Sequence, residues 1–218
     1  MRYFNLHTHS SVNDSEILEV VNQYPREFNP HVSLYSIGIH PWHIDELLVS
    51  GDLEIIESKL LLDDCLALGE CGLDKRIETP LNLQLDVFEK QLAIAEKYKK
   101  PVILHCVAAF SEVIEVKKRL GISVPMIIHG FSKNEQTAKQ LLDNGFYLSF
   151  GKYLLRNPEL ESVFKMIPED RFFLETDTIE EGIRDVYALA AQYRNIESEN
   201  LKNIISRNFN HVFNSALI

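Results

Sequence analysis

The chain has 218 residues, of which 45% are hydrophobic and 25% charged, a composition that can fill the core of one large α/β domain. Its 22 basic and 32 acidic residues give a net charge of −10, which argues against a basic face that holds nucleic acid or an anionic membrane. Three cysteines without C-x-x-C spacing, a start without an apolar leader and the absence of an 18-residue apolar run predict a cytoplasmic protein with reduced thiols.

Short apolar runs of strand length recur along the whole chain. In chain order they are FNLHTH (4–9), EILEVVNQYP (16–25), LYSIGIH (34–40), CLALGECGLD (65–74), PVILHC (101–106), PMIIHG (125–130), FYLSFG (146–151) and FFLETD (172–177). From residue 64 onward the runs are apolar on both faces, as expected for parallel strands that are buried on both sides. Residues 16–25 fit a short helix or a strand, and the Val20-Val21 pair favours the strand.

Amphipathic stretches between these runs predict helices. Thr79-Pro80 indicates an N-cap followed by proline at the first helical position. Ser132 and Glu135 fit a capping box, and Gly145 fits the C-terminal stop of the same helix. A final amphipathic helix is expected after Ser198. Alternating strands and helices predict a single α/β domain over residues 1–218 with a parallel sheet.

Nearly every apolar run ends in a side chain that can bind a metal ion. These side chains are His7, His9, His40, Glu70, His105, His129, Glu175 and Asp177. Any one of them alone would be an ordinary strand-end polar group, but burying so many without partners would cost roughly several kcal/mol. In a barrel, the C-terminal ends of all strands lie on one face, where these side chains would converge. We therefore predict a metal site, and a TIM-like (β/α) barrel rather than an open doubly wound sheet.

Four histidines and two carboxylates are too many for one tetrahedral zinc ion and fit two divalent ions that share a carboxylate. The expected assignment places His7, His9 and Asp177 at one ion, His105 and His129 at the other, and Glu70 between them. Two ions about 3.5–4 Å apart can lower the pKa of a water and stabilise a displacement at phosphorus. Mixed nitrogen and oxygen ligands admit zinc, manganese, magnesium or nickel.

Six strings follow one another in the order H-T-H, GIHP, GECGLD, ILHC, IHGF and ETD. Together they resemble the TatD-type metal-dependent hydrolases, which are TIM-barrel members of the amidohydrolase superfamily associated with deoxyribonuclease activity. The resemblance extends from His7 to the string RNFNHVF near the end of the chain. It implies divalent-metal-dependent hydrolysis of phosphodiester bonds, of the 3′→5′ exonuclease type, with DNA as substrate.

The resemblance also implies roles for individual residues. His7, His9, His105 and His129 match the metal-binding histidines of the family. Glu70 matches its bridging carboxylate, and Asp177 matches the last-strand aspartate that binds metal and takes the proton from the nucleophilic water. His40, in the matching GIHP run, and Lys75, just after GLD, are expected to reach substrate phosphate.

Two departures from the family concern how nucleic acid would be bound. In the family an arginine usually follows the position of His105, whereas the sequence here is HCVAAF, which contains no arginine. The run ETD is followed by TIEEG, which adds the acidic residues Glu180 and Glu181 near the expected site. Neither departure changes a predicted ligand.

The third departure is length. Only 28 residues separate His9 from Gly38, where the family fits two helices and a strand. A strand over residues 16–25 would keep eight strands while the first outer helices are missing. Strand backs uncovered in this way would be apolar and exposed, so we expect a homodimer contact on the N-terminal side of the barrel.

Three alternative functions fit part of the pattern. HTHS also resembles the start of PHP-type phosphoesterases acting on small phosphate esters, although GECGLD and ETD have no place there. Amide hydrolysis, as elsewhere in the superfamily, often uses a carbamylated lysine at the bridging position, and Glu70 argues against it. A barrel kept for a non-catalytic role with incidental metal is supported by the missing arginine, but such a barrel needs none of the six ligands.

Overall fold

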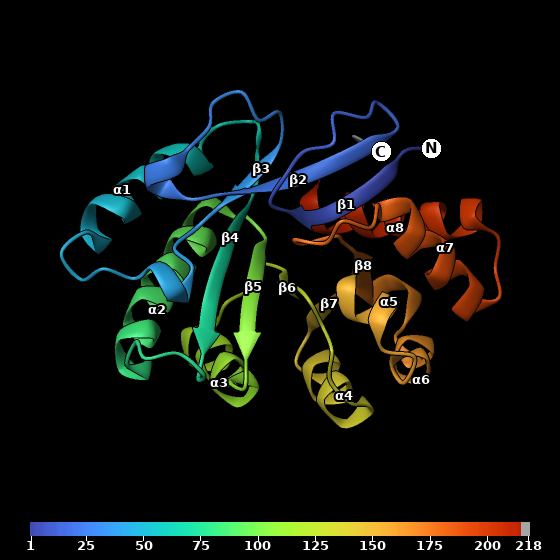
Figure 1. Cartoon of the computed structure of the whole chain (residues 1–218). Coiled ribbons are helices and arrows are strands. Elements are labelled where there is room, and N and C mark those ends of the chain that lie inside the picture. Colours follow the sequence, from blue (N-terminus) through green and yellow to red (C-terminus); the bar gives the residue numbers. More distant parts are fainter. Residues whose placement is uncertain (215–218) are drawn as a thin grey trace. The chain divides into compact units, whose positions relative to one another are not determined.

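Strands and helices alternate along the chain in the computed structural model, which describes residues 1–214 (Figure 1). The strands are β1 (Tyr3–Thr8), β2 (Ile17–Gln23), β3 (Tyr35–Ile37), β4 (Cys65–Asp74), β5 (Val102–Val107), β6 (Met126–Ile128), β7 (Phe146–Phe150) and β8 (Phe172–Leu174). The helices are α1 (Val49–Leu60), α2 (Leu81–Tyr98), α3 (Phe110–Leu120), α4 (Glu135–Asp143), α5 (Lys152–Arg156), α6 (Leu160–Met166), α7 (Ile183–Arg194) and α8 (Ser198–Phe213), with short 3₁₀ helices η1 (Pro25–Glu27), η2 (Pro41–His43) and η3 (Glu169–Arg171). All the predicted strands are present.

The chain divides into two compact units. The first unit comprises Met1–Val20 and Ile128–Ile218, and the second comprises Val21–Ile127. The prediction of one domain over residues 1–218 stays a prediction. Each unit brings together its own set of strand-end polar side chains, so each is described by itself.

In the second unit, the end of β2 and the strands β3, β4 and β5 are parallel neighbours in chain order. Helices α1 and α2 pack on β4, and α3 packs on β5 (Figure 1). Strands β4 and β5 approach closely at Gly72, whose φ is +141° and whose added Cβ would lie 1.9 Å from the carbonyl oxygen of His105. Only glycine fits this position, which explains the second glycine of GECGLD.

In the first unit, β7 pairs with β8, and residues beyond β8 join β1. Helices α7 and α8 pack on β1, where the buried hydroxyl of Tyr187 donates to the carbonyl oxygen of Phe4 (3.1 Å). The ring of Phe4 packs edge-on against Phe173 and Phe209, with centroids 5.9 and 4.7 Å away. Burial of aromatic rings of this size stabilises by roughly 1.5–3 kcal/mol each, so β1 is firmly held.

The N-terminal region agrees with the sequence in its elements and differs in its surface. Residues 16–25 contain strand β2, and the described residues between β1 and β3 form no α-helix, as predicted. The apolar side chains of β2 are nevertheless buried, with Leu18, Val20 and Val21 at most 7% exposed. The exposed strand backs on which the dimer prediction relied are therefore absent from β2, and the dimer itself stays a prediction.

Two helix starts differ from the predicted ones. Helix α2 has Pro80 as its N-cap, one residue later than predicted, and Thr79 instead accepts a hydrogen bond from the Gln84 side chain (2.7 Å). The capping box over Ser132 and Glu135 is wrong: the N-cap of α4 is Asn134, whose Oδ1 accepts from the amide of Thr137 (3.0 Å). Asn134 directly precedes the first helical residue, so its side chain reaches the free amide of Thr137 in the first turn.

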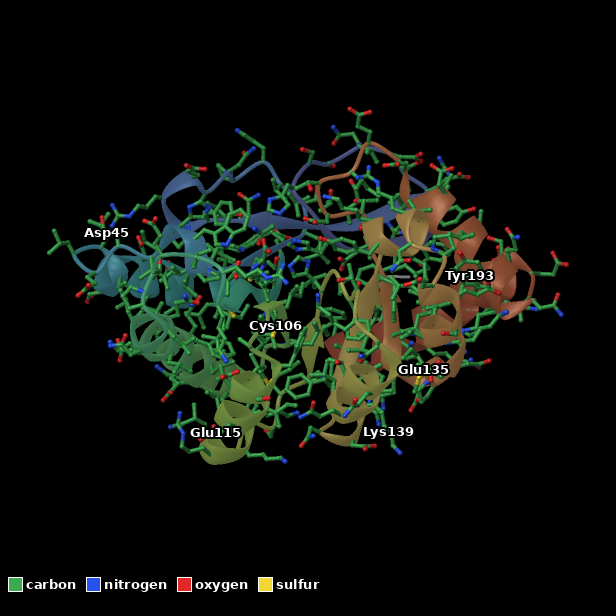
Figure 2. All side chains as sticks on the ribbon, turned by 60° about the horizontal axis from the view of Figure 1, so that its bottom comes forward. Asp45, Cys106, Glu115, Glu135, Lys139 and Tyr193 are labelled. Atoms are coloured by element: carbon green, nitrogen blue, oxygen red, sulfur yellow. The ribbon has the colours of Figure 1, made fainter. Side chains whose placement is uncertain are left out.

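Exposed charged side chains such as Glu115 on α3 and Lys139 on α4 project outward from their helices (Figure 2).

None of the helices within residues 1–214 is both long enough and apolar enough to cross a lipid bilayer. The cytoplasmic location expected from the sequence stays a prediction.

Glu96, near the end of α2, holds the loop before β6 in place through hydrogen bonds. Its carboxylate accepts from the amides of Ser123 (2.8 Å) and Val124 (3.2 Å) and from the Ser123 hydroxyl (2.6 Å), and pairs with Lys99. Burial alone would raise the pKa of this carboxyl, but these donors outweigh it and hold the pKa at about 2.

We expect Glu96→Gln to lower the free energy of unfolding by about 1 kcal/mol at pH 7, because the amide loses the charge-assisted part of these bonds. A pKa lowered in the folded state stabilises above the ordinary value near 4.5 and ceases to do so as the pH falls towards 2. Urea unfolding at pH 7 and pH 3 should show a smaller difference at pH 3. Glu54→Gln, on the exposed face of α1, serves as control; an equal difference at both pH values would contradict the prediction.

Candidate metal-binding groups

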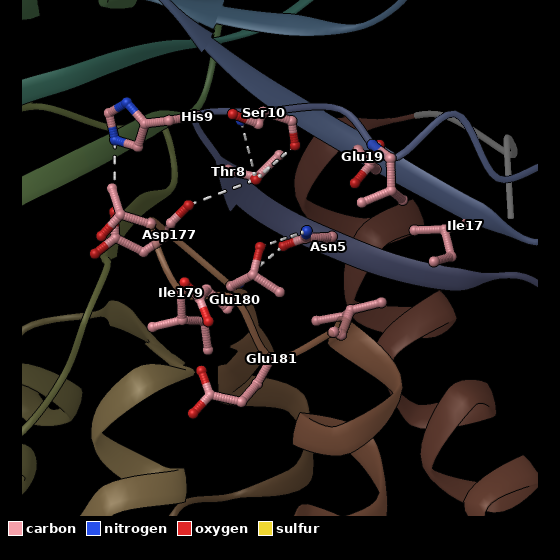
Figure 3. Close-up of a pocket in the computed structure, with 15 residues that line it drawn as sticks. Asn5, Thr8, His9, Ser10, Ile17, Glu19, Asp177, Ile179, Glu180 and Glu181 are labelled. Atoms are coloured by element: carbon pink, nitrogen blue, oxygen red, sulfur yellow. Dashed lines mark hydrogen bonds and ion pairs between the residues drawn. The ribbon is translucent and has the colours of Figure 1, made fainter.

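The first-unit group consists of His7, His129 and Asp177, whose potential ligand atoms all lie within 4.8 Å of one another. The rings of His7 and His129 have centroids 4.5 Å apart. The Asp177 carboxylate Oδ1 lies 3.8 Å from Nε2 of His7 and 3.5 Å from Nε2 of His9, so His9 borders the same group. His7 is fully buried, whereas the Asp177 side chain is 23% exposed and faces an adjoining pocket (Figure 3).

Main-chain hydrogen bonds position this group. The carbonyl oxygen of His7 accepts from the amides of Thr176 (3.3 Å) and Asp177 (2.9 Å), and the amide of His9 donates to the carbonyl oxygen of Asp177 (3.2 Å). The side chain of Asn5 exchanges two further bonds with Thr176, at 2.9 and 3.0 Å. Asp177 thereby adopts a left-handed conformation, φ +57°, that aspartate tolerates better than most residues.

A buried glutamate stands behind the first-unit group. Oε1 of Glu175 lies 3.4 Å from Nδ1 of His129 and accepts from the amide of Gly130 (2.6 Å), while Oε2 has no hydrogen-bond partner among residues 1–214. The backbone at Gly151 lies so close that an added Cβ would be 2.4 Å from the carbonyl oxygen of Glu175. A carboxylate 1% exposed with so few donors is a costly group to bury, and it lies against the ring of His129.

The second-unit group consists of His40, Glu70 and His105, again with potential ligand atoms within 4.8 Å of one another. Oε1 of Glu70 lies 3.3 Å from Nε2 of His40 and 3.2 Å from Nδ1 of His105. The amide of Glu70 donates to Oδ1 of Asn22 on β2 (2.8 Å). The ring nitrogen Nδ1 of His40 accepts from the amide of Trp42 (3.1 Å), which leaves Nε2 directed at Glu70.

A second buried carboxylate stands behind His105. Oδ2 of Asp74 lies 3.3 Å from Nε2 of His105 and accepts from the indole N–H of Trp42 (2.9 Å). Oδ1 of Asp74 accepts from the amide of Arg76 (2.8 Å). Burial would raise the pKa of Asp74, but the donors from Trp42, Arg76 and His105 outweigh it and hold the pKa below its usual range.

Burial lowers the pKa of His40, an effect that the neighbouring Glu70 opposes. A neutral imidazole is the form that binds metal. Both groups combine imidazole nitrogens with a carboxylate, a donor set that suits zinc, manganese and nickel. Ligand atoms about 2.0–2.2 Å from an ion lie at most about 4.4 Å apart, so only small side-chain movements would bring either group to this geometry. The residues present therefore fit a divalent ion in each unit.

The structure places the predicted site residues as follows. His7, His9, His129 and Asp177 come together in the first unit, and Glu70 and His105 in the second. His129 has potential ligand atoms within 4.8 Å of those of His7 and Asp177, and its expected pairing with His105 stays a prediction. His40, expected to reach phosphate, lies among the candidate ligands of the second-unit group. Lys75 forms an ion pair with Glu112, and its substrate role stays a prediction.

Asp74 is a functional candidate that the sequence analysis did not single out, and Glu175 was named there as a possible ligand but was given no role. Each occupies the end of a run that already contains a predicted ligand: Glu175 lies in FFLETD and Asp74 ends GECGLD. Their strand-end positions were a usable signal. What the sequence lacks is the neighbour across the sheet that each carboxylate contacts.

Parallel strands that carry two such groups in or just after their C-terminal halves are typical of a metal-dependent α/β protein. The chain belongs to the TatD related DNase family, whose match spans residues 4–214. The resemblance found in the sequence is thereby confirmed.

Proteins similar to this chain in sequence are named as metal-dependent hydrolases or as a nuclease. The chain is 33% identical over 147 residues to the uncharacterized metal-dependent hydrolase YabD of Bacillus subtilis, covering 65% of this chain and 57% of YabD. It is 29% identical over 198 residues to the uncharacterized metal-dependent hydrolase YcfH of Escherichia coli K12, covering 83% and 73%. It is 28% identical over 176 residues to the 3′-5′ ssDNA/RNA exonuclease TatD of Citrobacter koseri, covering 78% and 66%. Its match thus spans less than two thirds of YabD.

Solved structures share the fold. The TatD homologue YJJV of Escherichia coli K12 has a TM-score of 0.84 at 20% identity, covering 98% of both chains. A TatD family hydrolase of Entamoeba histolytica has a TM-score of 0.79 at 18% identity, covering 98% of this chain and 99% of the other. The predicted TIM-like (β/α) barrel fold is confirmed, with the outer helices after β1 and β2 missing from the described residues.

We expect one variant in each group to lower metal content. His129→Asn and His105→Asn should each reduce bound zinc or manganese by about one ion per chain, because each removes one of few ligands. Metal content after dialysis is measured by mass spectrometry. His211→Asn and His31→Asn, both exposed, are the controls in the first and second unit. Full metal content in both test variants would show that these groups do not hold the ions.

Asp74→Asn should weaken the second-unit group without removing a ligand. An amide in place of the carboxylate weakens the acceptor that orients His105, so we expect the metal dissociation constant to rise about 10- to 100-fold. The measurement is a competition titration with a chelating dye, and Asp63→Asn, in an exposed turn, is the control. An unchanged dissociation constant together with a lower melting temperature would assign Asp74 a purely structural role.

Proposed function

We propose that the chain is a divalent-metal-dependent hydrolase of phosphodiester bonds, a deoxyribonuclease of the 3′→5′ exonuclease type. The observation that carries the proposal is the pair of histidine and carboxylate groups at strand ends of a TatD-family chain. A relative named as a 3′-5′ ssDNA/RNA exonuclease supports nucleic acid as the substrate class.

We assign one ion to each group, with zinc, manganese, magnesium and nickel as candidates. His7, His9, His129 and Asp177 would hold the ion of the first unit, and His40, Glu70 and His105 that of the second. The bridging role of Glu70 stays a prediction from the sequence. A divalent ion would supply electrophilic activation of water and of the phosphoryl group.

The chain's own residues would orient the reaction and move its proton. Asp177 is the carboxylate best placed for this, because its side chain is partly exposed and its Oδ1 lies beside His7 and His9. It would accept the proton of the water that attacks phosphorus, while the bond from phosphorus to the leaving sugar oxygen breaks and that oxygen takes a proton from solvent. Glu175 and Asp74 would hold the rings of His129 and His105 in position.

A small phosphate ester is the second candidate substrate. The pocket beside Asp177 has a volume of about 270 Å³ and is lined by the carboxylates of Glu19, Glu180 and Glu181 (Figure 3). Acidic side chains there repel a polyanion more than a compact monoester, since repulsion grows with the number of phosphates.

Shortening of a 5′-labelled single-stranded DNA oligonucleotide tests the proposal. The reaction is run with manganese, magnesium, zinc or nickel and with EDTA, and p-nitrophenyl phosphate is tested in parallel. We expect metal-dependent shortening that Asp177→Asn lowers by about 10²- to 10⁴-fold, the range of a lost general base. Asp143→Asn, an exposed aspartate at the end of α4, should retain full activity.

Each outcome separates the candidates. Shortening that persists in EDTA would refute metal dependence, and normal turnover by Asp177→Asn would remove Asp177 from the reaction. Turnover of the monoester without shortening of DNA would favour the second candidate.

A further inference from the structure

A pocket in the second unit opens directly beside the second-unit group. It has a volume of about 190 Å³, and its lining includes Tyr24, Arg26, Glu27, His40, His43 and Asp52. These residues come from η1, from η2, from α1 and from the residues that precede the two 3₁₀ helices. His40 belongs both to this lining and to the second-unit group, so an occupant of the pocket would lie next to the candidate metal ligands of that group.

The charges of the pocket argue against an anionic occupant. Nε of Arg26 donates to Oδ1 of Asp52 at 2.7 Å, and the Asp52 side chain is only 9% exposed, so this carboxylate neutralises the arginine. Glu27 adds a second negative charge to the lining. A phosphate would therefore meet one cation and two carboxylates.

The rings of the pocket favour a flat, uncharged occupant. Tyr24 and His43 pack edge to face, with centroids 5.2 Å apart and planes at 77°. His43 in turn lies 5.7 Å from His40. Aromatic faces and the plane of a guanidinium are the surfaces on which nucleobases stack. A volume below the roughly 300 Å³ of a complete small-molecule site fits one ring system with the rest of the ligand outside.

We propose that this pocket is a nucleobase subsite, an inference that rests on the proposed nuclease function. The heterocycle of the substrate's terminal nucleotide would stack on the face of Tyr24 with the nearly perpendicular ring of His43 at its edge, while Arg26 offers a donor and Glu27 an acceptor. Because base stacking tolerates every base, the subsite would distinguish a nucleotide with a base from one without it rather than one base from another. It would also compensate for the arginine missing after His105 without adding positive charge.

Two single-stranded oligonucleotides test this subsite, one ordinary and one whose 3′-terminal nucleotide is an abasic tetrahydrofuran analogue. We expect the wild-type chain to show a KM about 5- to 100-fold higher for the abasic oligonucleotide, the range that stacking supplies, with a smaller change in kcat. Tyr24→Ala should raise KM for the ordinary oligonucleotide by a similar factor and abolish the difference between the two. Tyr24→Phe keeps the ring and should behave as wild type.

Control variants test whether the change in KM is specific to the pocket. Tyr153→Ala removes an exposed tyrosine from α5 of the first unit and should change neither KM. If Tyr24→Ala fails to fold, His43→Ala, at an exposed histidine, provides the same test. Equal KM values of the wild-type chain for both oligonucleotides would overturn the subsite while the nuclease proposal stands.

Ligand binding separates a failed subsite from a failed nuclease. If no oligonucleotide is shortened, calorimetric titration with deoxyadenosine, which carries no phosphate, is compared with titration with inorganic phosphate. Binding of deoxyadenosine that Tyr24→Ala abolishes would support the subsite even though the nuclease proposal had failed. Absence of deoxyadenosine binding, or binding of phosphate alone that Arg26→Ala abolishes, would overturn it.

Discussion

The first-unit group depends on the two hydrogen bonds that the carbonyl oxygen of His7 accepts from the amides of Thr176 and Asp177. They join the first strand to the residues that follow the last one, and the return bond from His9 to Asp177 completes the join. Because the main chain fixes the backbone of His7, His9 and Asp177, their side chains need no contacts of their own to converge. These bonds leave the backbone of Asp177 in a left-handed conformation. The conformational cost of this backbone is offset by the hydrogen bonds and by the packing of β1.

Both units use the same arrangement to orient a histidine. His129 faces the buried carboxylate of Glu175, and His105 faces that of Asp74, at 3.4 and 3.3 Å. A buried carboxylate is costly unless it is paired, and backbone amides of Gly130 and Arg76 meet part of that cost. The ring nitrogen that faces the carboxylate is thereby distinguished from the one that faces the group, which is how such pairs fix a histidine tautomer.

Local pattern predicted the strands, because they depend on the chain's own alternation, and it named side chains that the structure gathers into candidate metal-binding groups. It also favoured β2 as a strand, since the Val20-Val21 pair is local information. It failed at the start of α4, where Ser132 and Asn134 are both possible caps two residues apart and the helix begins after Asn134. It did not single out Asp74 and could not group His40 with Glu70 and His105, because both assignments depend on neighbours across the sheet. The pocket around Tyr24 was equally inaccessible to pattern analysis, since its lining comes from two short 3₁₀ helices, the residues before them and one residue of α1.

The net charge of −10 constrains how any polyanionic substrate can bind. Counterion release cannot supply much affinity to a chain whose candidate cations are engaged, as Lys75 is with Glu112 and Arg26 with Asp52. Affinity must then come from metal ions acting on the reacting phosphate and from uncharged contacts, of which base stacking is the strongest available. This balance favours binding of a few nucleotides at the end of a nucleic-acid strand over extended contact with its phosphate backbone. This distribution of charge is thus compatible with the terminal, exonucleolytic mode of hydrolysis that we propose.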